Sequence, residues 1–176
     1  MAETPSGMLN SIGLQGPGID RFIETDLAWL EERGARTIVS IAGGTVDEYA
    51  KLAARLRVAR GVAAIEVNIS CPNVENRGQV FACDPKSAAD VIQAVRRHSE
   101  PKMPIFAKLS PDVTDIVSIA ESVVRAGATG VSLINTLLGM VINPDTMRPH
   151  LAGVTGGLSG PAIRPVAVRC VWQVRK

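Results

Sequence analysis

Hydrophobic positions along the chain fall into two kinds of segment, short apolar runs and longer stretches with helical spacing. The short runs are rich in β-branched residues and end in glycine or polar residues, which predicts buried strands. Between them, apolar residues recur three and four positions apart, as on one face of a helix. The expected strands are residues 35–44, 62–70, 104–110 and 129–136.

Five segments carry the helical spacing: residues 19–34, 45–61, 84–99, 114–127 and 161–176. Thr45 and Glu48 form a capping-box signature, and Asp84 precedes a proline at a first helical position. Gly34 and Gly127 can take the left-handed conformation that ends a helix. Residues 1–18 and 137–160 have neither pattern, so we expect loops there.

Strands and helices alternate strictly, and this order predicts an α/β fold with a parallel sheet and helical crossovers. Two architectures compete, an open doubly wound sheet and a (β/α)₈ TIM barrel. No GxGxxG or GxxxxGK[ST] motif follows any expected strand, which disfavours a nucleotide-binding open sheet.

Composition narrows the class of protein. The 176 residues suit one domain or part of one, and a net charge of +2 without a basic block argues against nucleic acid as a partner. We expect no signal peptide and no membrane span. The three cysteines form no CxxC pair, which favours a reducing cytoplasm. His98 and His150 are far apart, so we expect no metal site.

Polar residues mark the ends of three expected strands. Asn68, Lys108 and Asn135 lie at equivalent ends of successive strands, the edge where parallel α/β folds build active sites. A buried lysine is costly without a partner, so Lys108 has a second interpretation, a salt bridge to a neighbour such as Glu66. The set of three favours an active site.

Cys71 follows one of these strand ends in the stretch NISCPN. A free cysteine is commonly a buried structural thiol, but the flanking asparagines favour a functional one. No histidine lies nearby in sequence to activate it as a nucleophile, so proton transfer suits it better. The glycine-rich stretch 155–161 is no serine-hydrolase elbow, because Pro161 stands where GxSxG requires glycine.

Five motifs in order then suggest a family: GMLNSIGLQGPG, EVNISCPN, AKLSPDVTDI, INTLLGM and TGGLSGPAIRPVA. Together they resemble class 1 dihydroorotate dehydrogenases, most closely the NAD-linked catalytic subunit of class 1B. This family consists of FMN-containing (β/α)₈ barrels that oxidise dihydroorotate to orotate in pyrimidine (UMP) biosynthesis. The resemblance implies a cytoplasmic oxidoreductase, an iron–sulfur flavin partner subunit for electron transfer, and a homo-oligomer when complete.

The resemblance also implies roles for matching residues. Cys71 would be the base that takes a proton from C5 of dihydroorotate while hydride leaves C6 for the flavin. Lys108 would lie by N1 and the C2 carbonyl of the flavin, and Ser40 stands where relatives usually carry a flavin-contacting asparagine. The other implied cofactor contacts are Asn68, Ile134 and Gly160, and the implied substrate contacts are Asn10, Ile12, Gly13, Leu14, Asn68, Asn73, Asn135 and Thr136.

The expected strands match only part of such a barrel. They correspond to the family's strands three to six, so residues 1–176 would form an incomplete FMN-dependent barrel domain, about four strands of eight, with poor activity by itself. Two other hypotheses for the function stay open: a dihydropyrimidine dehydrogenase-type flavin barrel, and a non-catalytic remnant or interaction module. The terminal electron acceptor, NAD through a partner subunit or fumarate, also stays open.

Overall fold

Four parallel strands form the central sheet of the protein. The computed structural model describes residues 1–70, 72–73 and 79–175, without the side chains of residues 72, 73 and 79. The order of the parallel sheet is β3-β4-β7-β8, and its strands are β3 (Thr37–Ile41), β4 (Val62–Asn68), β7 (Ile105–Lys108) and β8 (Gly130–Ser132). These are the four expected strands, and the prediction of a parallel sheet is confirmed.

The helices also lie where the spacing predicted them. The first helical segment joins α1 (Ile19–Phe22), a π-helical turn (η1, Ile23–Leu27) and α2 (Ala28–Glu32). No described helix is long and apolar enough to cross a membrane. The remaining helices are α3 (Val46–Arg57), α4 (Pro85–His98), α5 (Ile116–Arg125) and α6 (Arg164–Arg175), and two 3₁₀ turns are η2 (Phe81–Cys83) and η3 (Pro161–Ile163).

Side-chain caps fix where three of the helices begin: Thr45 caps α3, Asp84 caps α4 and Asp115 caps α5. The hydroxyl of Thr45 accepts a hydrogen bond from the backbone N–H of Glu48 at 3.1 Å. The Asp84 carboxylate accepts one from Ser87 N–H at 2.7 Å. Hydrogen bonding from the side chain of Ser87, and then from its backbone N–H, lowers the pKa of Asp84. Each cap satisfies a backbone donor that has no partner within the helix.

A second sheet, which is antiparallel, corrects the prediction of loops at residues 1–18 and 137–160. Its β2–β12 pairing joins residues about 150 positions apart, and its strands are short and mostly contain glycine, so they have no periodic pattern in the sequence. The order is β1 (Ala2–Thr4), β2 (Gly7–Asn10), β12 (Gly156–Ser159) and β9 (Leu137–Gly139). Two smaller pairs are β10 (Ile142–Asn143) with β11 (Arg148–Pro149), and β5 (Pro72–Asn73) with β6 (Gln79–Val80).

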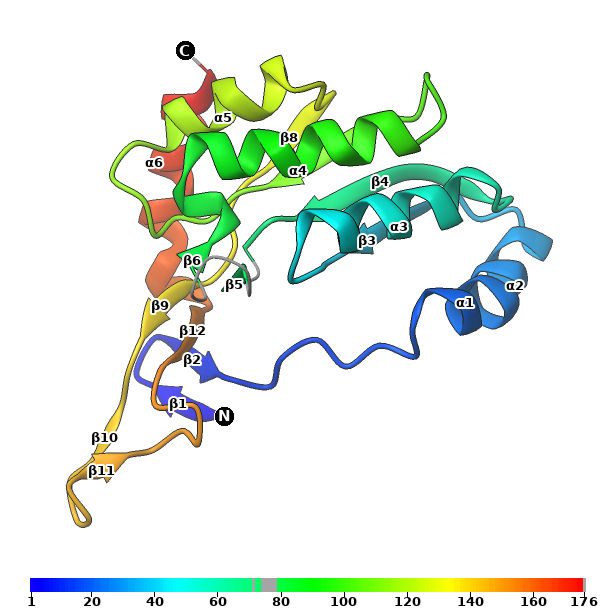
Figure 1. Ribbon diagram of the computed structural model, residues 1–176. Coiled ribbons are helices and arrows are strands. Elements are labelled where there is room, and N and C mark those ends of the chain that lie inside the picture. The colour runs from blue at the N-terminus through cyan, green and yellow to red at the C-terminus, as the bar shows by residue number, and fades with distance from the viewer. Residues whose placement is uncertain (71, 74–78, 176) are drawn as a thin grey trace.

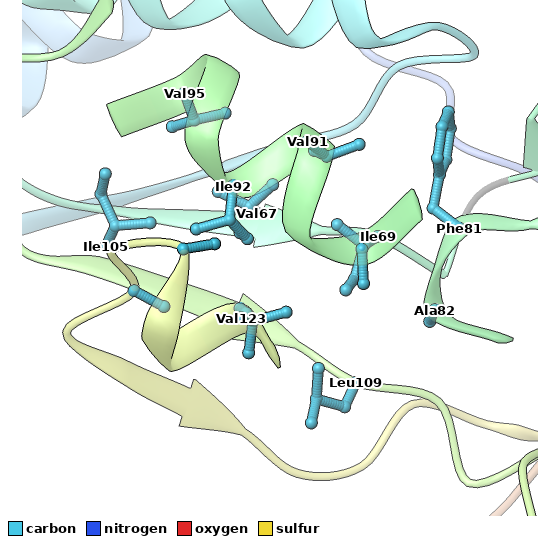
Figure 2. Packing of buried hydrophobic residues seen from close by; sticks show 14 of the residues in the cluster. Val67, Ile69, Phe81, Ala82, Val91, Ile92, Val95, Ile105, Leu109 and Val123 are labelled. Carbon is cyan, nitrogen blue, oxygen red and sulfur yellow. The ribbon is translucent and has the colours of Figure 1, made fainter. Parts of the chain in front are cut away.

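The main core lies between the parallel sheet and its helices. Alternate residues of β4, Ile65 and Val67, are buried and pack with apolar residues of α4 and α5 such as Ile92 and Val123 (Figure 2). Figure 1 shows α3 and α4 along one face of the sheet, and an extended segment that runs from β2 to α1. The remaining alternate residues of the strands therefore point to the face opposite these helices.

Adjacent valines on α5 give a direct test of this core. Val123 is fully buried whereas Val124 is 53% exposed. Val123→Ala removes two buried methyl groups and leaves a cavity, so we expect a loss of about 2–3 kcal/mol in the free energy of unfolding. Val124→Ala is the matched control and should stay within about 0.5 kcal/mol of the parent in urea denaturation. Equal effects of the two changes would contradict this packing.

Candidate active site

The strand register brings three polar residues side by side. Asn68 at the end of β4 pairs with Lys108 at the end of β7, and Lys108 pairs with Ser132 at the end of β8. Paired residues of parallel strands point to the same face, and their neighbours Val67 and Ala107 are buried in the helix-facing core. Asn68, Lys108 and Ser132 therefore form a polar row on the face opposite the helices.

Hydrogen bonds to its backbone carbonyl and its side-chain oxygen hold Asn68 in place, whereas its amide N–H groups donate none within the described residues. The hydroxyl of Tyr49, a fully buried residue of α3, donates to the backbone carbonyl of Asn68 at 2.6 Å. The backbone N–H of Ser70 donates to Asn68 Oδ1 at 3.2 Å. Within the described residues the Asn68 amide nitrogen donates no hydrogen bond. Its two N–H groups are thus available to an acceptor on a ligand.

Glu66 is bound by two serines rather than by Lys108. Its carboxylate accepts hydrogen bonds from Ser40 Oγ at 3.0 Å and from Ser132 Oγ at 2.8 Å. Lys108 takes part in none of the ion pairs among the described residues, so the interpretation of Lys108 as a salt-bridge partner of Glu66 is wrong. Ser132 was not expected from the sequence as a site residue. Its alignment with Lys108 and its reach to Glu66 become visible only once the register is known.

Residues after β8 continue along the same edge. The backbone N–H of Leu109 donates to the carbonyl of Ser132 at 3.0 Å, and the N–H of Asn135 donates to the carbonyl of Leu109 at 2.9 Å. These bonds hold Asn135 beside the end of β7, one residue beyond Lys108. Ile134 packs against the main core.

The antiparallel sheet joins the N-terminal segment to this region. Asn10 on β2 is the register partner of Gly157 on β12, and a Cβ at Gly157 would collide with the side chain of Thr136. β2, which carries Asn10, and β9, which follows Thr136, flank β12 on its two sides (Figure 1), and glycine at position 157 leaves room for the Thr136 side chain. Gly160 lies farther along, with a φ of 97° that favours glycine, against the backbone of Gly7.

A cleft of about 720 Å³ opens along β3. This volume is in the range of pockets that take a drug-sized molecule or part of a cofactor. Leu14, Ser40 and Asn68 line it together with apolar side chains of α1, α2 and α3. Ile12 and Gly13 are exposed on the same loop. Lys108, Ile134, Asn135 and Thr136 are not among the lining residues, so the expected site residues fall into two neighbouring groups joined by Asn68.

The position expected to be catalytic, Cys71, lies outside the described residues, as does the side chain of Asn73. Ser70, which precedes Cys71, has a buried hydroxyl without a hydrogen-bond partner among the described residues. Cys83, which lies on η2, is a free thiol, as is the buried Cys170. Burial, and then the negative charge of Asp112, raise the pKa of Cys83, so that thiol stays protonated at neutral pH.

Comparison with known proteins gives a family. The family model described as dihydroorotate dehydrogenase matches residues 1–176. The chain is 54% identical over 176 residues to a protein of Citrifermentans bemidjiense named dihydroorotate dehydrogenase B (NAD(+)), catalytic subunit, and 51% identical to the protein of the same name from Desulforamulus reducens. Each match covers all of this chain and 57% of the relative, so the chain spans a little over half the length of these relatives.

A solved structure has the same fold. It is described as DHODH from Eimeria tenella in complex with ferulenol, and it matches with a TM-score of 0.68 at 20% identity. The match covers 96% of this chain and 52% of that one. The likeness supports the partial barrel, because the parallel sheet and its helices lie over about half of that larger structure.

Proposed function

This chain belongs to the dihydroorotate dehydrogenase family, and we propose that it supplies strands three to six of an FMN-dependent barrel that oxidises dihydroorotate to orotate. The observation that carries the proposal is the polar row of Asn68, Lys108 and Ser132, continued by Asn135 at the same edge. That edge is where the carboxyl ends of parallel strands meet and where barrel enzymes carry their chemistry.

The amide groups suit the proposed substrate. Dihydroorotate presents a carboxylate and ring amides, which need both donors and acceptors, and asparagine supplies both. The Asn68 amide nitrogen donates no hydrogen bond within the described residues, and a backbone bond to Leu109 holds Asn135 beside the end of β7, the strand next to β4. Asn10 and Thr136, which flank Gly157, would complete the contacts from the antiparallel sheet, with Asn73 and the loop of Ile12, Gly13 and Leu14.

The residues present fit FMN as the cofactor. The cleft along β3 has the size for a flat ring system and contains the polar groups of Ser40 and Asn68. Lys108, which forms no ion pair with any of the described residues, lies next to Asn68. Bound FMN would accept hydride from the substrate. Lys108 would supply positive charge at the electron-rich side of the ring, and Ile134 and Gly160 would complete the contacts. The Ser40 hydroxyl already donates to Glu66, so it would meet the cofactor as an acceptor.

Cys71 is the proposed base, since a thiol with an ordinary pKa near 8.5 forms thiolate at cellular pH with modest help. In the sequence it comes three residues after Asn68, the last residue of β4. The raised pKa of Cys83 makes that other thiol a poor candidate for the same role.

The relatives' name, catalytic subunit, supports a partner subunit in the enzyme. We assign this role to an iron–sulfur flavin subunit that passes electrons to NAD, in a cytoplasmic homo-oligomeric assembly. Copurification of the chimera described next with that subunit would test the assignment.

A chimera gives the sharpest test of the function. Residues 1–176 replace the matching span of the Citrifermentans bemidjiense catalytic subunit, whose remaining length supplies the rest of the barrel. We expect this chimera to bind FMN and to oxidise dihydroorotate, measured as bleaching of flavin absorbance without oxygen. The 176-residue chain by itself should bind FMN weakly and turn over little. A folded chimera that binds no FMN, or keeps FMN without turnover, would contradict the proposal.

Ligand choice separates this function from its nearest alternative. Orotate carries a carboxylate and uracil does not, so a dihydroorotate dehydrogenase site should bind orotate far more tightly than uracil. Titration of the chimera with each ligand, followed by the change in its flavin spectrum, measures this difference. Preference for uracil would favour a dihydropyrimidine dehydrogenase-type barrel instead.

A further inference from the structure

The parallel sheet carries two charged side chains, Glu66 on β4 and Lys108 on β7. They have opposite sign and point to the same face. Glu66 lies two residues before Asn68, which is the register partner of Lys108. Both are partly buried, where attraction between opposite charges is stronger than in open water. A salt bridge between them would be the ordinary outcome, and the structure has none.

Two serine hydroxyl groups donate hydrogen bonds to the Glu66 carboxylate instead. Ser40 comes from β3 and Ser132 from β8, the two edge strands of the sheet, and each donates to a different oxygen of Glu66. Hydrogen bonds to an ionised group are stronger than neutral ones and fix its direction. The carboxylate is thereby held in one orientation, with Lys108 outside its contacts.

We propose that Ser40 and Ser132 are positioning residues, which hold the Glu66 carboxylate away from Lys108 and so keep the lysine ammonium free for a ligand. The nature of that ligand, an electron-rich ring such as that of FMN, rests on the proposed function. The arrangement of the four side chains does not. Without the two hydroxyls, the carboxylate has Lys108 as its remaining charged neighbour on the described strands, and it would turn to the ammonium.

Chemical labelling of amines tests the arrangement in the 176-residue chain without any ligand. A paired ammonium holds its proton more tightly, and only the free amine reacts. In the double variant S40A/S132A, labelling of Lys108 relative to exposed Lys102 should fall about three- to tenfold, measured by mass spectrometry of peptides. Adding Glu66→Gln removes the negative charge and should restore labelling. The double variant S118A/S122A removes two hydroxyls from α5 and is the matched control.

The result in the chimera connects the arrangement to binding. We expect the dissociation constant of FMN to rise about fivefold in S40A/S132A, the order of one lost charged contact, and to recover when Glu66→Gln is added. Unchanged labelling of Lys108 in S40A/S132A, or reduced labelling that persists with Glu66→Gln, would overturn the inference. A chimera that binds no FMN would overturn the proposed function instead, while the labelling still decides the role of the serines.

Discussion

Replacing Cys71 by alanine in the chimera is expected to slow oxidation of dihydroorotate about 10²–10⁴-fold, the usual contribution of a positioned acid–base group. Alanine cannot accept the proton that leaves the substrate, whereas the groups proposed to hold substrate and cofactor remain. FMN should therefore stay bound, and orotate should still perturb its spectrum. Rapid mixing with dihydroorotate under anaerobic conditions measures the loss as slower bleaching of the flavin.

Cys83→Ala is the matched control for this change, because it removes a thiol whose raised pKa keeps it protonated. Its turnover should equal that of the parent chimera. Cys71→Ser keeps the size of the side chain but replaces the thiol by a far weaker acid, so its rate should also be low. Release of FMN from the Cys71→Ala protein would point to a structural thiol, and full activity would exclude Cys71 as the base.

Much of the fold could be predicted because its signals are local. The strands of the parallel sheet are continuous apolar runs, and the helices between them carry capping residues such as Thr45 and Asp84 at their start. Strand–helix alternation then implies a parallel sheet, and a parallel sheet places strand ends together. Asn68 and Lys108 were therefore expected at one edge, and the register makes them direct neighbours.

The antiparallel sheet could not be predicted, because its signals are not local. Its strands, such as β2 and β12, are four residues long and contain glycine, and Asn10 meets Gly157 across most of the chain. Pairings of this kind follow from the tertiary fold and leave no periodic pattern. The expected substrate contacts Asn10 and Thr136 came from family resemblance, and the structure adds a physical reason why these distant residues lie near one strand.

The contacts on the polar face of the parallel sheet could be predicted only in part. Alternation along β4 puts Glu66 and Asn68 on one face, but it does not say which neighbour Glu66 contacts. Charge alone favours Lys108 as the partner of Glu66. In the structure the partners are instead Ser40 on β3 and Ser132 on β8, the strands at the two edges of the sheet. Side-chain partners across a sheet depend on reach and register together, so a residue such as Ser132 has no signal of its own in the sequence.

Lys108→Met in the chimera should lower turnover about 10²–10³-fold, the scale of one lost electrostatic group at a reacting centre. Methionine keeps an unbranched apolar chain of similar length and removes the charge. The loss should fall mainly on the rate of reduction by dihydroorotate rather than on orotate binding, because the proposed contact of Lys108 is with the cofactor. Single-turnover reduction and orotate titration measure the two effects separately.

Two further variants isolate the charge as the cause. Lys102→Met removes an exposed charge outside the sheet and should leave both measurements unchanged. Lys108→Arg keeps the positive charge with a different shape, so it should retain more activity than Lys108→Met. Since Glu66 is held by Ser40 and Ser132, removal of Lys108 should not release a buried ion pair, and the Lys108→Met protein should unfold at nearly the parent urea concentration. A large loss of stability with unchanged single-turnover reduction would instead make Lys108 a structural residue.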